Sequence, residues 1–106
     1  MRLSIQCHEA ENILKGFIEG EIDIHTAPIL INELEMIVLT EGMLIELDLS
    51  NVTYMDSSGL GVIVALYKRL IKEKVGLKLL LSKRIMRMFN ITGLGEFMNI
   101  ELRRAN

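Results

Sequence analysis

The chain contains little of what marks a secreted, disulfide-bonded or nucleic-acid-binding protein. Its 106 residues include one cysteine, one proline and no tryptophan, and only 5% of them are aromatic. A single thiol excludes a disulfide framework within the chain and is compatible with a reducing compartment. So few aromatic side chains provide no platform on which nucleic-acid bases would stack. These absences exclude several functional classes before any motif is considered.

Long apolar runs and a strong net charge are missing as well. The longest uninterrupted apolar run, Val62–Tyr67, is far shorter than the about 20 residues that a membrane-spanning helix needs. Polar residues follow Met1 too soon for the apolar segment of a signal peptide. With 12 basic and 14 acidic residues, the formal net charge is -2, which does not indicate a nucleic-acid partner. We therefore expect a cytoplasmic protein that binds neither membrane nor nucleic acid.

What the chain does contain is typical of one globular domain. Half of its residues are hydrophobic and a quarter are charged, which is the composition of a folded rather than a disordered chain. A chain of this length buries about two-thirds of its unfolded surface, enough for a core without disulfides or metals. We expect residues 1–106 to form a single domain.

Apolar periodicity and turn residues predict strands that alternate with helices. Strands are predicted at residues 3–7, 13–20, 43–49, 77–81 and 97–102. Helices are predicted at 28–39, from the 56–61 turn to about 74, and from 83 to 91. The fold class is therefore α/β, a single mixed β-sheet of four to five strands with helices packed against it.

The same spacing predicts which helical residues are buried and where the helices begin and end. In the first helix we expect a core face made of Leu30, Ile31, Leu34, Ile37 and Val38. In the second we expect one made of Leu60, Ile63, Val64, Tyr67, Leu70 and Ile71, with Val62, Leu66 and Val75 off it and exposed. Thr26 and Ser82 are predicted N-caps, Pro28 suits a first turn, and Gly76 is the predicted stop of the second helix.

The most informative segment is the turn Asp56-Ser57-Ser58-Gly59-Leu60-Gly61, where a strand ends and a helix begins. The first N–H groups of a helix lack internal partners and attract negative charge, so this turn suits a phosphate. The simpler interpretation is an N-cap. However, a cap needs neither Gly59 nor Gly61, each of which costs about 1 kcal/mol in a helix relative to alanine. We interpret the glycines as room for a docking partner or an enzyme that acts on Ser57.

A second polar loop, Gly20–Pro28, links an earlier strand to the first helix. It contains Asp23 and Thr26, and it occupies the position in its strand–helix unit that the Asp56 turn occupies in the next. Ligand and partner sites in open α/β sheets gather at such loops. The two loops are therefore expected to form one surface, although Asp23 could equally do no more than brace its own loop.

Enzymatic and metal-binding interpretations are less well supported. The nucleophile pattern Gly-x-Ser-x-Gly has Met55 in place of its first glycine, and His8 and His25 fit no triad spacing. No Gly-Lys-Ser/Thr is present, which excludes a Walker phosphate loop. Three scattered acids, Asp23, Asp48 and Asp56, are a weak metal signal. We expect no catalytic residue, no resident metal and no cofactor.

Three segments, Gly20–Asp23, Met55–Gly61 and Met88–Leu94, fall in the order and spacing of a known family. Across essentially its whole length the chain resembles the STAS family, specifically the stand-alone bacterial anti-sigma factor antagonists of sporulation and stress response. The resemblance implies the STAS fold. It implies that Ser57 is phosphorylated by an anti-sigma factor that is itself a histidine-kinase-like ATPase. It also implies a partner-binding surface made of Asp23, Thr26, Asp56, Ser57, Ser58, Gly59 and Gly61.

The same resemblance implies a regulatory cycle rather than catalysis by this chain. The unphosphorylated form would bind the anti-sigma factor and release the sigma factor, and a serine phosphatase that carries its own metal would reset Ser57. Two alternatives remain open. One is a STAS scaffold subunit of a larger stress-sensing or transport complex, with Ser57 unmodified. The other is a weak nucleotide-binding or nucleotide-hydrolysing protein that uses the Ser57 turn.

Overall fold

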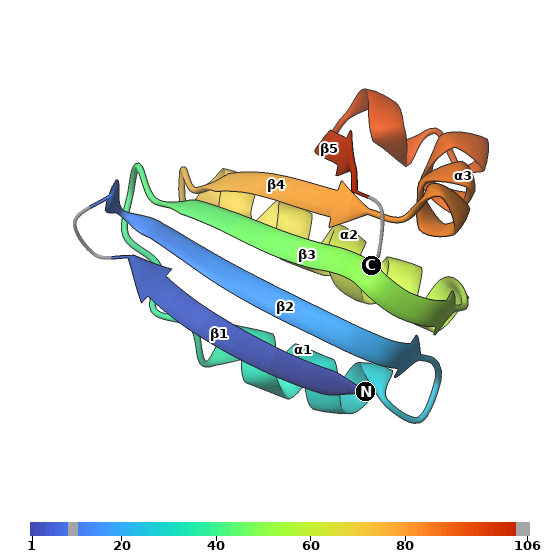
Figure 1. Ribbon diagram of the computed structural model, residues 1–106. Helices are drawn as coiled ribbons and strands as arrows, with labels where there is room; N and C mark the ends of the chain where they lie inside the picture. Colours follow the sequence, from blue (N-terminus) through green and yellow to red (C-terminus); the bar gives the residue numbers. More distant parts are fainter. Residues whose placement is uncertain (9–10, 104–106) are drawn as a thin grey trace.

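Two antiparallel strands open the chain, and parallel strands joined by helices follow them (Figure 1). The computed structural model describes residues 1–8 and 11–103, and for residues 5–8 it describes the backbone only. In chain order the elements are β1 (Arg2–His8), β2 (Ile13–Ile22), α1 (Ala27–Glu35), β3 (Leu44–Met55), α2 (Ser57–Lys72), β4 (Gly76–Leu81), α3 (Lys83–Ile91), the short 3-10 helix η2 (Leu94–Glu96) and β5 (Asn99–Leu102). Residues 9 and 10 of the turn predicted before β2 lie outside the described residues.

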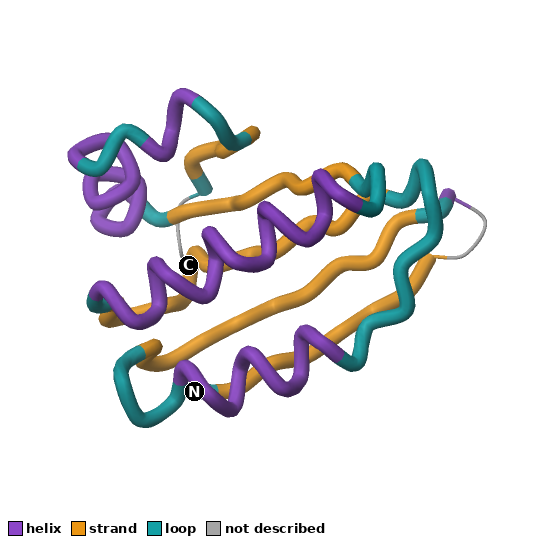
Figure 2. Tube along the Cα trace, turned by 180° about the vertical axis from the view of Figure 1, so that it is seen from behind, coloured by secondary structure: helices purple, strands orange, loops and turns teal. Residues whose placement is uncertain are grey.

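The strands form one five-stranded sheet in the order β1-β2-β3-β4-β5. Strands β1 and β2 pair in antiparallel orientation, and the other neighbouring strands are parallel. The predicted mixed sheet and α/β class are therefore confirmed. Helices α1 and α2 lie side by side across one face of the sheet, and α3 lies beyond them, next to β4 and β5 (Figure 2).

The core fills the space between the helices and that face of the sheet. Because successive side chains of a strand point to opposite faces, Ile45, Leu47 and Leu49 of β3 all point into the core. Leu30 of α1 and Phe89 of α3 meet them there and are fully buried. This packing fixes the positions from which α1 and α2 begin.

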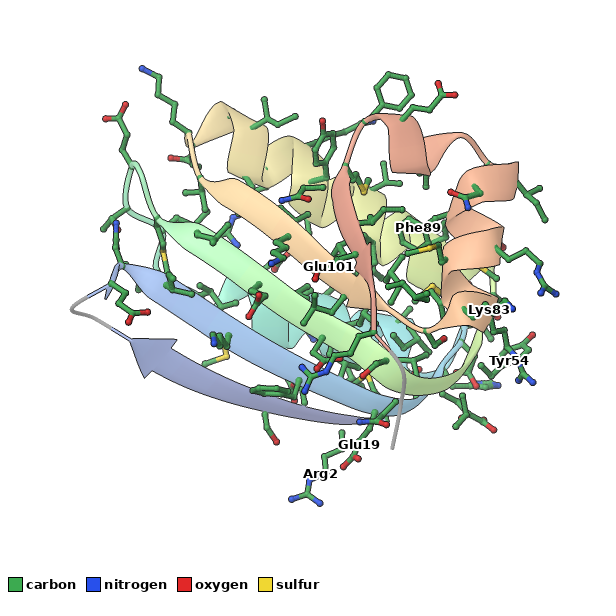
Figure 3. The ribbon with its side chains drawn as sticks, turned by 45° about the horizontal axis from the view of Figure 1, so that its top comes forward. Arg2, Glu19, Tyr54, Lys83, Phe89 and Glu101 are labelled. Atoms are coloured by element: carbon green, nitrogen blue, oxygen red, sulfur yellow. The ribbon has the colours of Figure 1, made fainter. Side chains whose placement is uncertain are left out.

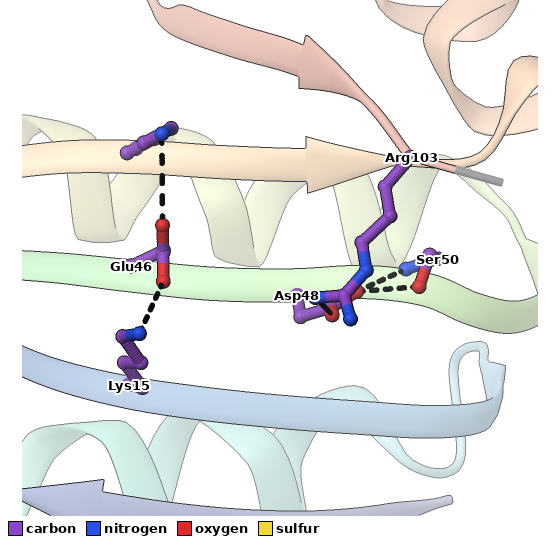
Figure 4. Close-up of polar contacts among 6 residues, drawn as sticks. Lys15, Glu46, Asp48, Ser50 and Arg103 are labelled. Carbon is purple, nitrogen blue, oxygen red and sulfur yellow. Dashed lines mark hydrogen bonds and ion pairs between the residues drawn. The ribbon is translucent and has the colours of Figure 1, made fainter. Parts of the chain in front are cut away.

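The opposite face of the sheet carries several charged side chains (Figure 4). Glu46 on β3 lies between two lysines, 3.8 Å from Lys15 Nζ and 3.7 Å from Lys78 Nζ. Farther along β3, the buried carboxylate of Asp48 accepts hydrogen bonds from Ser50 and pairs with Arg103 at 2.5 Å. Asp48 therefore lies within this face of the sheet, apart from Asp23 and Asp56, which follow the strand ends.

Helix α1 is shorter than predicted, because it ends at Glu35 rather than near Leu39. Its last turn tightens through i to i−3 hydrogen bonds from Met36 and Ile37. The Arg69 guanidinium of α2 then donates to the carbonyl oxygens of Leu34 and Ile37, both at 3.1 Å. A basic group at this end of a helix satisfies free carbonyls and favours the helix dipole. The helix stops here, and Val38, which was predicted to be buried, is 81% exposed.

Two strands also differ from prediction at their ends. Strand β3 continues six residues beyond the predicted Leu49, to Met55, because its later part pairs with the end of β2. The Thr53 hydroxyl adds a hydrogen bond of 3.3 Å to the Gly20 carbonyl. Strand β5 begins at Asn99 rather than at Phe97, which follows η2 and is exposed.

The buried face of α2 was predicted in the wrong orientation. Val62, Leu66 and Val75 are buried rather than exposed, whereas Ile71 is 57% exposed. The reason is that α2 packs against α1 as well as against the sheet, which turns its apolar face toward α1. Leu60, Val64 and Tyr67 are only partly buried.

The end of α2 was also assigned to the wrong residue. Lys74, with φ 57°, takes the left-handed position that ends the helix, and the Val75 N–H donates to the Leu70 carbonyl at 2.8 Å. This hydrogen bond is the terminating bond of a Schellman motif. Gly76, the predicted stop, is the first residue of β4.

Candidate functional site at the ends of strands β2 and β3

The two polar loops lie side by side because they follow neighbouring parallel strands. Ile22 at the end of β2 pairs with Met55 at the end of β3. The Asp56 N–H, immediately after β3, donates to the Ile22 carbonyl at 3.3 Å. Both strands therefore deliver their loops to the same edge of the sheet (Figure 1). The prediction that the Asp23 and Asp56 loops share one surface is confirmed.

Asp56 is the N-cap of α2. Its backbone is extended, with φ −104° and ψ −170°, and its Oδ1 accepts from the Ser58 N–H at 2.9 Å and from the Gly59 N–H at 3.4 Å. Two of the free N–H groups at the helix start are thereby satisfied, and the carboxylate lies at the positive end of the helix dipole. The cap interpretation of this turn is therefore correct, and it leaves the serine side chains unused.

Ser57 is the first residue of α2, and its side chain is exposed. Within the described part of the chain, no hydrogen bond engages its hydroxyl group. The neighbouring Ser58 is partly buried. An exposed serine hydroxyl that has no internal partner, at a helix N-terminus, is open to an incoming enzyme and suited to carry an anion.

The two glycines of the turn lie in different surroundings. A Cβ at Gly59 would lie 2.7 Å from Cγ2 of Ile22 and 2.8 Å from Cγ of Met55, and both of these side chains are buried. Gly59 therefore lets α2 sit close to its own sheet, and the interpretation that it leaves room for a partner is wrong. Gly61 is exposed, and a Cβ there would meet nothing within 4 Å. Only Gly61 faces open space.

Asp23 and Thr26 brace the first loop. Asp23 Oδ1 accepts from the His25 N–H at 2.9 Å and from the Thr26 N–H at 3.0 Å. The Thr26 hydroxyl accepts from the Asp23 N–H at 2.9 Å and donates to the Glu21 carbonyl at 3.0 Å. Thr26 stands at the N-cap position of α1 but makes no side-chain cap bond. The predicted cap role of Thr26 is therefore wrong, because its hydroxyl is used within the loop.

These bonds make the Asp23 loop sensitive to acid. The amide of Thr26, and next that of His25, hold the pKa of the Asp23 carboxyl below its ordinary value of 3.8. A lowered pKa in the folded state means that the stabilisation is complete above pH 3.8 and is lost as the pH falls below it. We expect Asp23→Asn to remove this pH-dependent part of the free energy of unfolding.

Urea unfolding of wild type and Asp23→Asn between pH 7 and pH 3 measures this effect. The difference in free energy of unfolding between the two proteins should be constant at neutral pH and should shrink below pH 3.8. Asparagine keeps an oxygen acceptor for the same amides, so the comparison isolates the charge. Parallel curves down to pH 3 would contradict the prediction.

Sequence reasoning missed two apolar side chains at this edge. Ile24, in the Asp23 loop, is 67% exposed, and Tyr54, shortly before Asp56, is 49% exposed. The start of α3 lies beside the end of β3: Arg84 donates to the Thr53 carbonyl at 3.2 Å, and Lys83 lies near Tyr54 in Figure 3. The sequence signal that could have indicated them is an apolar residue among residues typical of loops. The ends of β2 and β3 therefore present acids and exposed apolar groups, and the basic start of α3 lies next to the end of β3.

No further chemistry is visible in the described residues. They contain no cluster of three or more His, Cys, Asp or Glu that could bind a metal ion. His25 is exposed, and the side chain of His8 is not among those described. No described helix combines the length and the apolar character needed to cross a membrane.

Known proteins resemble this chain over nearly its whole length. A family model described as the STAS domain matches residues 4–106. The anti-sigma-B factor antagonist of Listeria monocytogenes is 41% identical over 103 residues, covering 95% of this chain and 90% of that protein. The Bacillus subtilis anti-sigma-B factor antagonist is 39% identical over 101 residues, covering 94% and 92%. The crystal structure of an anti-sigma factor antagonist from Mycobacterium paratuberculosis matches with a TM-score of 0.78 at 26% identity, covering 93% of this chain and 85% of that one. The chain therefore belongs to the STAS domain family.

Proposed function

We propose that this chain is an anti-sigma factor antagonist controlled by phosphorylation of Ser57. Unphosphorylated, it binds an anti-sigma factor that is also a serine kinase, and the sigma factor is released. Phosphorylation ends that binding. The observation that carries the proposal is the exposed Ser57 hydroxyl at the first position of α2, beside the Asp23 loop. The names of the relatives, which are 36–41% identical, support the same role.

The chemistry of modification needs nothing from this chain except the serine. A bond forms between Ser57 Oγ and the γ-phosphorus of ATP, the bond from that phosphorus to the bridging oxygen breaks, and ADP leaves. The serine proton passes to a base on the kinase. The product adds about −1.5 to −2 charges at neutral pH. The positive end of α2 offsets part of their repulsion from Asp56, so the fold has no reason to change.

The partner surface consists of the two loops. Asp23, Thr26, Asp56, Ser57, Ser58 and Gly61 present it, with Ile24 and Tyr54 as apolar contacts. Gly59 contributes indirectly, by allowing α2 to start close to Ile22 and Met55. A loop held by its own hydrogen bonds loses little conformational freedom on binding, which favours affinity.

In this role, residues 1–106 act as one STAS domain in the cytoplasm, with no catalysis and no cofactor of their own. Resetting the switch belongs to a serine phosphatase, whose metal is the phosphatase's own. Since the change at Ser57 alters an interface rather than a reaction, regulation is a change in the population of one complex.

The direct test is phosphorylation by the anti-sigma factor kinase encoded in the same genome. With ATP, the mass of the purified wild type should rise by one phosphate. Ser57→Ala should not change, and Ser58→Ala, the matched control, should still be modified. Phosphate transfer to Ser58, or none to wild type with an active kinase, would contradict the proposal. The latter result, with stable incorporation into a STAS assembly, would favour the scaffold alternative.

A further inference from the structure

An open groove lies between α1 and α2, the two helices that lie side by side in Figure 2. Leu34, Val62 and Leu66 line it and are themselves buried, and Ile31 forms one rim and is 37% exposed. The groove is thus largely apolar but open to solvent. An open groove between two helices has the shape that receives a third helix, whose side chains form a ridge between them.

The groove is continuous with the Ser57 surface along α2. Ser57, Gly61 and Ala65 follow one another at intervals of four residues, so they lie on one side of the helix. All three are exposed, and Ala65 lines the groove. From Ser57 to Ala65 the distance along the helix is about 12 Å. No large side chain on this stripe of α2 separates the phosphorylation site from the groove.

The charges of the groove indicate what kind of helix would fit. Two charged residues line it, Arg69 and Glu35. The Arg69 guanidinium is engaged with the carbonyl oxygens of Leu34 and Ile37. Glu35 is exposed, and in the described part of the chain no ion pair or hydrogen bond involves its side chain. The groove therefore offers an apolar floor and an unpaired carboxylate at its rim.

We propose that the anti-sigma factor that phosphorylates Ser57 also places an amphipathic helix in this groove. Its apolar side chains pack against Ile31 and Leu66, and a lysine or arginine lies opposite Glu35. The inference rests on the function proposed above and extends the partner surface from the strand ends to the α1–α2 face. It gives the complex an anchor that is separate from the phosphorylated residue.

Ala65→Arg tests the proposal, because it places a long charged side chain at the groove without filling a buried space. We expect the dissociation constant of the purified unphosphorylated protein for its anti-sigma factor to rise about 10- to 100-fold. Ile71→Arg introduces the same residue on another exposed side of α2 and should leave the constant within about twofold. Glu35→Lys should weaken binding and reduce its dependence on salt. Thermal melting of each variant, followed by circular dichroism, shows whether a change in affinity is caused by a loss of folding.

The outcomes separate this inference from the proposed function. If Ala65→Arg binds as tightly as wild type while Ser57→Asp does not, the groove proposal fails and the phosphoswitch stands. If wild type binds no anti-sigma factor, both fail. Light scattering measures self-association. If Ala65→Arg no longer self-associates but still binds the anti-sigma factor as wild type does, the groove would be assigned to a second copy of this chain. If wild type binds a fluorescent fatty acid and Ala65→Arg does not, again with unchanged anti-sigma binding, the groove would be assigned to a lipid chain.

Discussion

Replacing Ser57 with aspartate is expected to weaken the complex with the anti-sigma factor by two to three orders of magnitude. An interface that forms over Ser57 must remove the new carboxylate from water, beside the existing charge of Asp56. A buried charge without a partner costs about 3–5 kcal/mol, and each 1.4 kcal/mol is tenfold in affinity. Phosphorylation adds more charge than aspartate does and should have at least as large an effect.

The fold itself should tolerate this change. Ser57 is exposed at the first position of α2, where an acidic residue is favourable for the helix dipole. We therefore expect the free energy of unfolding of Ser57→Asp to equal that of wild type or to exceed it by about 0.3–1 kcal/mol. Loss of binding without loss of stability distinguishes a switch at the interface from a switch in folding.

Isothermal titration calorimetry with the purified anti-sigma factor measures the effect on affinity. Ser57→Asn is the matched control, because it has nearly the size and shape of aspartate without the charge. It should bind much more tightly than Ser57→Asp. Equal weakening by both variants would assign the effect to shape rather than charge. Undiminished binding by Ser57→Asp would refute the electrostatic mechanism of the switch.

The second large effect is expected at Gly59. Gly59→Val should lower the free energy of unfolding by about 2–4 kcal/mol. The new Cβ would meet Ile22 and Met55 at 2.7 and 2.8 Å, and both of these side chains are buried in the core. Overpacking of this kind typically costs about 1–3 kcal/mol, and the two additional methyl groups of valine increase it.

Gly61→Val is the control for this substitution, two residues farther along the same helix. A Cβ there meets nothing within 4 Å, and glycine and valine differ by only a few tenths of a kcal/mol in helix propensity. Its free energy of unfolding in urea should lie within about 0.5 kcal/mol of wild type. A loss of stability at Gly61→Val as large as that at Gly59→Val would show that close packing on the sheet does not explain the loss at Gly59.

Gly59→Val should also weaken anti-sigma binding, because α2 can accommodate the new side chain only by moving away from the sheet. Ser57 moves with the helix start and loses its alignment with the Asp23 loop. Gly61→Val should affect binding only through contact with the partner. Comparing affinity with stability for both variants therefore separates positioning of the site from contact at the site.

Features that depend on a few neighbouring residues could be predicted from the amino-acid sequence. The Asp56 cap, the Ser82 cap and the order of the strands and helices follow from side chains that bond or pack within one or two turns of their own segment. Alternating apolar residues likewise predicted the sheet and the edge at which the two polar loops meet. Local hydrogen bonding and periodicity suffice for such features.

Contacts between separate helices and strands could not be predicted from the sequence and became known from the three-dimensional structure. The orientation of α2 depends on α1 as well as the sheet, so Val62 and Leu66 are buried against expectation. Arg69, 32 residues from Ile37 in sequence, helps to set the end of α1. The need for glycine at position 59 of α2 comes from its close contact with Ile22, at the end of β2. Each of these outcomes rests on contacts between residues far apart in the chain, and periodicity within one segment contains no information about its neighbour.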